Sequence, residues 1–92
     1  MSVRVDLIEN GTATGAWKPW PGGPGVFMVR GTFGGATVRL QVLFDDTALD
    51  ISGGDVDLTG AGVGGFFLPP CQIRAEVENG PPSGIFATAL GD

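Results

Sequence analysis

The segment from Gly25 to Phe44 alternates apolar and polar residues on both sides of a Gly34-Gly35 pair. This two-residue period is typical of a β-strand with one buried face. Glycine pairs also accept the positive φ angles that a tight two-residue turn requires. The segment therefore predicts two antiparallel strands that pair as a hairpin around this turn.

Counting outward from the turn sets the register of the predicted hairpin. Val29 faces Leu40 on an apolar side, and Arg30 faces Arg39 on a polar side. A slip by one residue would mix the two sets, so the partition supports the register independently of the turn. The expected core consists of apolar residues of this hairpin and of one later strand: Phe27, Val29, Val38, Leu40, Val42, Ile73, Ala75 and Val77.

Short alternating runs elsewhere predict further strands. They lie at residues 2–8, 48–51, 56–59, 64–68, 71–78 and 85–90. With the central pair this makes about eight strands, which indicates one antiparallel β-sandwich over residues 1–92, of jelly-roll or immunoglobulin-like type. The first strand is expected at a sheet edge, and the last two strands are expected to form a second hairpin.

Residues 10–24 interrupt the alternation with three prolines and several glycines. Proline cannot donate to a β-ladder, so this segment is predicted to be a structured loop or a broken edge strand. It contains Trp17 and Trp20. These large rings either plug one end of the sandwich or stand out as anchors of an interface.

The charge and the composition narrow the function classes. Ten acidic residues against five basic ones give a net charge of −5, which disfavours nucleic acid and anionic membranes as partners. No secretory signal or membrane-spanning run is apparent, so synthesis in a cytosol is expected. The chain has no histidine and one cysteine, which removes the commonest metal ligand and general base as well as any intrachain disulfide.

Two features could carry chemistry, and both have a simpler structural explanation. The carboxylates between residues 45 and 57 could bind calcium, but the ligand order of a calcium loop is missing, so solvated turn and edge positions are favoured. Cys71 lies on the apolar side of its predicted strand and has no histidine to activate it, so it is predicted to be a small buried apolar residue rather than a nucleophile. We expect no catalytic residue, no metal and no cofactor, and hence no enzyme.

The predicted register places Arg30 directly opposite Arg39, where like charges destabilise a strand pair unless an anion intervenes. One source of that anion is a neighbouring strand, through Glu76 or Glu78. The other is an acidic patch on a partner subunit, since arginine is enriched in interfaces. The candidate interface residues are therefore Trp17, Trp20, Arg30 and Arg39.

Three motifs resemble those of a known protein class. They are Trp-Pro-Gly-Gly at 20–23, Gly-Thr-Phe-Gly-Gly-Ala-Thr-Val at 31–38, and a late Leu-Pro followed by Ile-Arg-Ala within 68–75. From Gly15 to Leu90 the chain resembles small glycine-rich virion proteins of tailed bacteriophages. The resemblance implies a capsid decoration (cement) protein, which binds the outside of the head as a trimer and clamps adjacent capsomers.

The resemblance also sets expectations for partners and location. It implies a homotrimer bound to the major capsid protein on the capsid surface of the virion, made in the host cytoplasm, with neither nucleic acid nor membrane as a partner. The alternative is a tail or fibre module that binds carbohydrate through exposed Trp17 and Trp20, since aromatic faces suit sugar rings. A third hypothesis is a calcium-dependent module that uses the carboxylates of residues 45–57.

Overall fold

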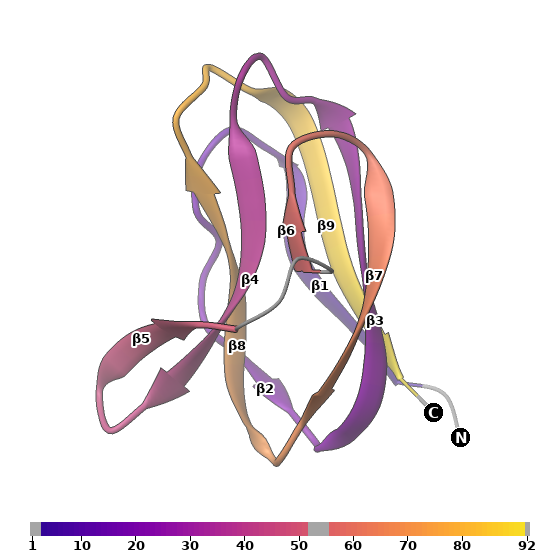
Figure 1. Ribbon diagram of the computed structural model, residues 1–92, viewed down its shortest axis with the longest axis vertical. Helices are drawn as coiled ribbons and strands as arrows, with labels where there is room; N and C mark the ends of the chain where they lie inside the picture. The colour runs from indigo at the N-terminus through magenta and orange to yellow at the C-terminus, as the bar shows by residue number, and fades with distance from the viewer. Residues whose placement is uncertain (1–2, 52–55, 92) are drawn as a thin grey trace.

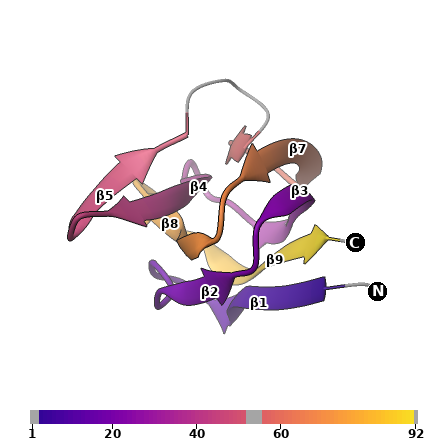
Figure 2. The same cartoon turned by 90° about the horizontal axis from the view of Figure 1, so that it is seen from below.

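The computed structural model describes residues 3–51 and 56–91 (Figure 1). In these residues the strands are β1 (Val3–Gly11), β2 (Lys18–Trp20), β3 (Gly23–Thr32), β4 (Thr37–Phe44), β5 (Thr47–Asp50), β6 (Asp57–Leu58), β7 (Gly62–Leu68), β8 (Cys71–Glu78) and β9 (Ser83–Gly91). Sheet A has the order β1-β9-β3-β7, and sheet B has the order β2-β8-β4-β5, with β6 also paired to β4. The two antiparallel sheets pack as a sandwich, and they appear as separate layers when the molecule is viewed from below (Figure 2).

The strand order is that of a jelly roll. Strands from opposite ends of the chain pair with one another, β1 with β9, β2 with β8 and β3 with β7. This is the pattern of a long antiparallel ribbon, and rolling the ribbon brings β9 beside β3 and β8 beside β4. The all-β sandwich is confirmed, and of the two predicted topologies the jelly roll is the one observed. β1 lies at a sheet edge, as predicted.

Both predicted hairpins are wrong, although the first turn is correct. Gly34 and Gly35 have φ angles of 58° and 88°, and the Ala36 N–H donates to the Phe33 carbonyl at 2.9 Å. However, the strands that this turn joins belong to different sheets, β3 to sheet A and β4 to sheet B. The connection between β8 and β9 also crosses from one sheet to the other. Alternation indicates which side chains are buried, but not which strand is the neighbour.

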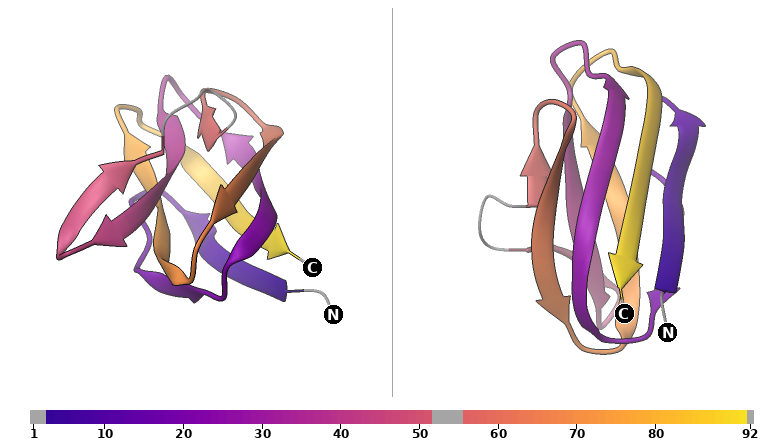
Figure 3. Two further views of the ribbon diagram at one scale, coloured as in Figure 1. Left: turned by 60° about the horizontal axis from the view of Figure 1, so that its bottom comes forward. Right: turned by 90° about the vertical axis from the view of Figure 1, so that its right-hand side faces the viewer.

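A hairpin does form between β4 and β5, and it turns at Asp45-Asp46, whose φ angles are 49° and 62°. Residues 42–50, which we call the arm, project from the body of the sandwich (Figures 1 and 3). In the predicted register Phe44 shares the apolar side of the hairpin with Leu40 and Val42, but it is 63% exposed. The arm projects away from sheet A (Figures 1 and 3), so Phe44 near its tip is not covered by the opposing sheet.

The core lies between the two sheets and follows the predicted alternation. Phe27 and Val29 enter it from sheet A, and Val38 and Leu40 enter it from sheet B. Val29 and Leu40, predicted as neighbours in one sheet, therefore belong to opposing sheets. Of the other predicted core residues, Ile73 and Ala75 are buried, whereas Val42 and Val77 are half-buried.

The predicted segment 10–24 contains the end of β1, the short edge strand β2 and the start of β3. The three residues of β2 include Pro19 and pair with β8 at the edge of sheet B. Trp20 is only 2% exposed, and its ring centroid lies 5.0 Å from that of Phe66. A Cβ at Gly25 or at Gly91 would come within 2.8 Å of the Trp20 ring, so both glycines make room for it. Trp20 thus plugs the sandwich, and burial removes it from the candidate interface.

Candidate functional site

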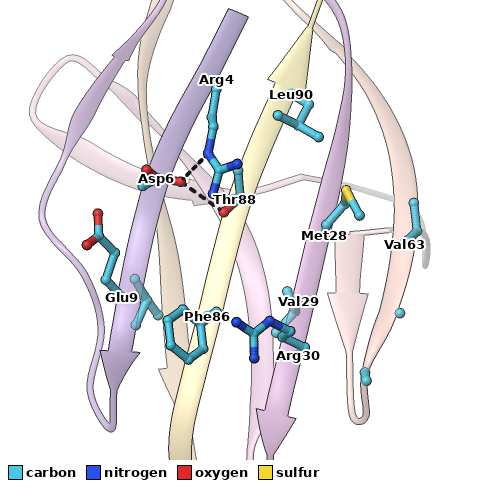
Figure 4. Close-up of a pocket in the computed structure, with 13 residues that line it drawn as sticks. Arg4, Asp6, Glu9, Met28, Val29, Arg30, Val63, Phe86, Thr88 and Leu90 are labelled. Carbon is cyan, nitrogen blue, oxygen red and sulfur yellow. Dashed lines mark hydrogen bonds and ion pairs between the residues drawn. The ribbon is translucent and has the colours of Figure 1, made fainter.

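The outer face of sheet A carries a groove with a volume of about 670 Å³ (Figure 4). The register explains which side chains meet there, because directly paired residues of neighbouring strands point to the same face. Thr88 of β9 pairs with Asp6 of β1 and with Met28 of β3, and Met28 pairs with Val63 of β7. The groove is therefore assembled from four strands that lie far apart in the sequence. Adjacent rows add Arg4 with Leu90 and Arg30 with Phe86.

A fixed ion pair occupies one part of the groove. The Arg4 Nε donates to Asp6 Oδ1 at 2.9 Å, and the Thr88 hydroxyl donates to the same oxygen at 3.2 Å. The hydrogen bond from Arg4 is the largest influence on the pKa of Asp6, which is lowered below its usual value. Asp6 therefore stays ionised at neutral pH, and its charge is already matched by Arg4.

Arg30 presents a second cation on the same face. Its guanidinium carbon lies 4.0 Å from the centroid of the Phe86 ring, a cation–π arrangement. Within residues 3–51 and 56–91, Arg30 forms no ion pair. The guanidinium of Arg30 thus lies over the Phe86 ring, with no described carboxylate within ion-pair distance.

Arg39 has the opposite environment, on the outer face of sheet B. Glu76 of β8 and Asp57 of β6 pair with it from either side. Its guanidinium nitrogens lie 3.1 Å from Glu78, 3.5 Å from Glu76, 3.7 Å from Asp57 and 3.8 Å from Asp50. Burial by itself would lower the pKa of Arg39, but these carboxylates, Asp57 first, raise it. The prediction that an intrachain glutamate neutralises Arg39 is confirmed.

The predicted shared face of Arg30 and Arg39 does not exist. The two arginines lie on the outer faces of different sheets, because β3 and β4 do not pair. Trp17 is half-buried, and the guanidinium of Arg74 lies 4.5 Å from its ring centroid. Arg74 also donates to Gln41 at 2.8 Å. Of the four candidate interface residues, Arg30 is therefore the one that is exposed, and it forms no ion pair with the described part of the chain.

The sequence reasoning missed Phe86 and Met28 as groove residues. The signal was present in β9, where Phe86, Thr88 and Leu90 alternate with buried alanines. Two large apolar residues on the solvent side of a strand are unusual for a solvated face.

Large apolar side chains are exposed on two separate surfaces. Val26, Met28, Val63 and Phe67 lie on the outer face of sheet A, and Phe44 and Leu49 lie on the arm. A single exposed apolar residue is ordinary, but a contiguous group often marks an interaction site. Both surfaces are therefore candidates for protein contact.

The described residues include no group of three or more His, Cys, Asp or Glu side chains arranged to hold a metal ion. Of the carboxylates proposed for calcium, Asp50 and Asp57 face Arg39, and Asp55 lies outside the described residues. No helix in the described part of the chain is long and apolar enough to cross a membrane.

Reversing the charge of Arg39 should destabilise the fold. The Arg39→Glu variant would place a fifth carboxylate among four, on a side chain that is only 19% exposed, and we expect a loss of about 1 to 3 kcal/mol in the free energy of unfolding. The matched control is Arg30→Glu, with an expected loss below about 1 kcal/mol, the scale of one exposed cation–π contact. Urea unfolding measures both. Equal losses in the two variants would show that the ion pairs of Arg39 do not contribute more to stability than the exposed contact of Arg30.

Cys71 should behave as a protected thiol. It is half-buried, and burial raises the pKa of its thiol above the ordinary value. In the pH range between the unfolded and folded pKa values, the unfolded state releases a proton that the native state keeps. The contribution of Cys71 to stability is therefore complete below the unfolded-state pKa and declines as the pH rises past it.

We expect Cys71 to react more slowly with a thiol reagent in the native protein than in urea, and we expect Cys71→Ala to weaken the alkaline decline in stability. Labelling rates and urea unfolding from neutral to alkaline pH measure these effects. Labelling at the same rate in both states would show that the thiol is open to solvent.

Comparison with known proteins identifies a related fold. The structure is similar to the crystal structure of SPBc2 prophage-derived protein YomS, with a TM-score of 0.71 and 11% sequence identity. The match covers 98% of this chain and 90% of that chain. No profile of a known protein family matches the sequence, and neither does any curated protein. At this identity the likeness establishes the fold of a prophage-derived protein and no specific activity.

Proposed function

We propose that this chain is a structural protein of a tailed-bacteriophage virion that decorates the outside of the head by binding the major capsid protein. The observation that carries the proposal is the exposed apolar surface of the domain. Val63 and Phe67 of sheet A and Phe44 of the arm are each more than 60% exposed. Burial of such side chains against other subunits is favourable by about 25 cal/mol per Å² of apolar area.

The chemistry on the surface suits contact better than catalysis. On sheet B, Arg39 is paired with the carboxylates of Asp50, Asp57, Glu76 and Glu78, and on sheet A the Asp6 carboxylate is paired with Arg4. Such satisfied pairs give a surface its orientation and specificity but do not move protons. The fold is similar to that of a prophage-derived protein, and this origin agrees with the resemblance of the sequence to small phage virion proteins.

The structure weakens the case for the alternative, a tail or fibre module that binds carbohydrate through Trp17 and Trp20. It requires two exposed tryptophan faces, but Trp20 is buried and the Trp17 ring is covered on one side by Arg74. The head-decoration proposal needs neither ring to be exposed.

Purified particles of the virus that encodes this chain test the proposal. We expect the chain in the particles at a copy number comparable to that of the capsomers, and we expect cryo-microscopy to place it on the outer head surface. Heads that lack it should rupture at a lower temperature than complete heads, because a bound protein stabilises the state that it binds. Absence of the chain from particles, or its location on the tail, would overturn the proposal.

A further inference from the structure

We propose that the groove on sheet A of one copy binds the arm of a second copy of this chain. The inference deepens the proposed function by assigning the self-contact of the oligomer, and it rests on that proposal for its place in the virion.

The arm has an exposed apolar side, which carries Phe44 and Leu49, and an acidic tip. Phe44 pairs with Thr47, and Val42 pairs with Leu49, so Phe44 and Leu49 lie on the same side of the hairpin. They are 63% and 42% exposed. Asp45 and Asp46 form the turn, both are exposed, and neither forms an ion pair within the described residues.

The groove has the complementary surface. Met28, Phe86 and Leu90 give it an apolar lining, and Arg30 supplies a cation that forms no ion pair within the described residues. Glu9 also lines the groove, and it too forms no ion pair among the residues described. Its volume of about 670 Å³ lies within the range of sites that enclose small molecules, so it has room for the side chains of a hairpin tip. Arg30 can therefore meet Asp45 or Asp46 of the arm while Phe44 covers the apolar lining.

Arg4 and Arg39 do not compete with Arg30 for the acidic tip of the arm, because both already form ion pairs. Arg39 is already surrounded by carboxylates, and Arg4 is bonded to Asp6. An acidic tip would meet repulsion at the carboxylates around Arg39 on sheet B, whereas at Arg30 it would meet a guanidinium that forms no ion pair within the described residues. The sequence offered two sources of an anion for the arginines, a glutamate of the same chain and an acidic patch of a partner, and we assign one source to each arginine. Arg39 is neutralised within the chain, and Arg30 is left for a partner.

The position of the two surfaces makes the contact intermolecular. The arm and the strands of the groove lie on opposite sides of the molecule (Figures 1 and 3), so a copy cannot place its own arm in its own groove. The contact joins two different surfaces, so it is heterologous where only one arm passes between two copies. Such contacts form a closed ring when the rotation between copies closes, which is how a trimer would arise.

Mutations that reverse the charges of the arm and of the groove test the inference. The variants are Arg30→Glu, the pair Asp45→Lys and Asp46→Lys, and all three changes combined in one chain. Sedimentation velocity over a concentration series measures self-association. We expect the wild type to associate, the first two variants to associate at least about tenfold more weakly, and the combined variant to recover, because the opposed charges are restored with reversed sign.

Two phenylalanines give a matched control for the apolar part of the contact. Phe44→Ala removes an arm side chain, and Phe67→Ala removes one that is 74% exposed on sheet A but does not line the groove. Because both rings are exposed, neither change should alter stability by more than about 0.5 kcal/mol. We expect Phe44→Ala to weaken self-association and Phe67→Ala to leave it unchanged.

The outcomes separate this inference from the proposed function. A wild type that stays monomeric at every concentration, or oligomers that are indifferent to Arg30→Glu and Phe44→Ala, would overturn the arm contact. Binding of these variants to heads is measured separately. If the wild type is monomeric and Arg30→Glu abolishes binding to heads, the capsid protein occupies the groove, which overturns the self-contact and keeps the proposed function. Binding of a sugar probe in the groove of a monomeric wild type that does not bind heads would overturn both.

Discussion

Replacement of Trp20 by alanine is expected to lower the free energy of unfolding by about 3 to 5 kcal/mol, the range for buried aromatic residues. The ring is almost fully buried and packs against Phe66 at a centroid distance of 5.0 Å. It lies over Gly25 and Gly91, positions where a side chain would collide with it. The surrounding backbone cannot collapse into the space without distorting both strands, so most of the cavity would remain.

The tryptophan that precedes it provides the control. Trp17 is half-buried and contacts Arg74 through one face of its ring, so Trp17→Ala should cost less than about 1 kcal/mol. Urea unfolding followed by far-ultraviolet circular dichroism measures both variants without relying on tryptophan fluorescence. The Trp20→Phe variant is expected to lose less than Trp20→Ala, because it keeps an aromatic ring and also removes the buried Nε1–H, which has no hydrogen-bond partner among the described residues. Equal losses for Trp17→Ala and Trp20→Ala would contradict the role of Trp20 as the plug.

The second large effect is expected at the turn between the sheets. Replacement of Gly34 and Gly35 by valine should cost about 3 to 5 kcal/mol, since each residue has positive φ and a side chain at Gly34 would also be overpacked. A Cβ at Gly34 would collide with the carbonyl oxygen of Pro81, which belongs to the connection between β8 and β9. The strain would therefore reach both crossings between the sheets at this end of the molecule.

Gly60→Val is the matched control for this turn. Gly60 also precedes a strand, but a Cβ there would meet no atom within 4 Å, and its φ is not positive. We expect its effect to stay within about 0.5 kcal/mol. Thermal and urea unfolding of the two variants provide the comparison. A double valine variant as stable as the wild type would mean that Gly34 and Gly35 do not need the backbone conformation described here.

The candidate site was only partly predictable. Arg30 was identified as a residue that requires an anion, but its expected neighbour was Arg39 and its actual neighbour is Phe86. The groove depends on β9 lying between β1 and β3, which brings Thr88 against Asp6 across 82 positions of sequence. No local pattern reports such a contact, because each strand alone shows only that one of its faces is exposed.

The sequence by itself determined which side chains are buried and where the backbone needs glycine. Phe27, Val29, Val38 and Leu40 are buried as their alternation predicts, and Gly34-Gly35 forms a turn with positive φ. Only the tertiary structure decided that this turn crosses between sheets. The reason is physical, since a two-residue period and a glycine turn are the same whether the strands pair side by side or face each other across a core. The choice between these arrangements depends on burial of the whole ribbon in the jelly roll, and this separates Arg30 from Arg39 and creates the groove.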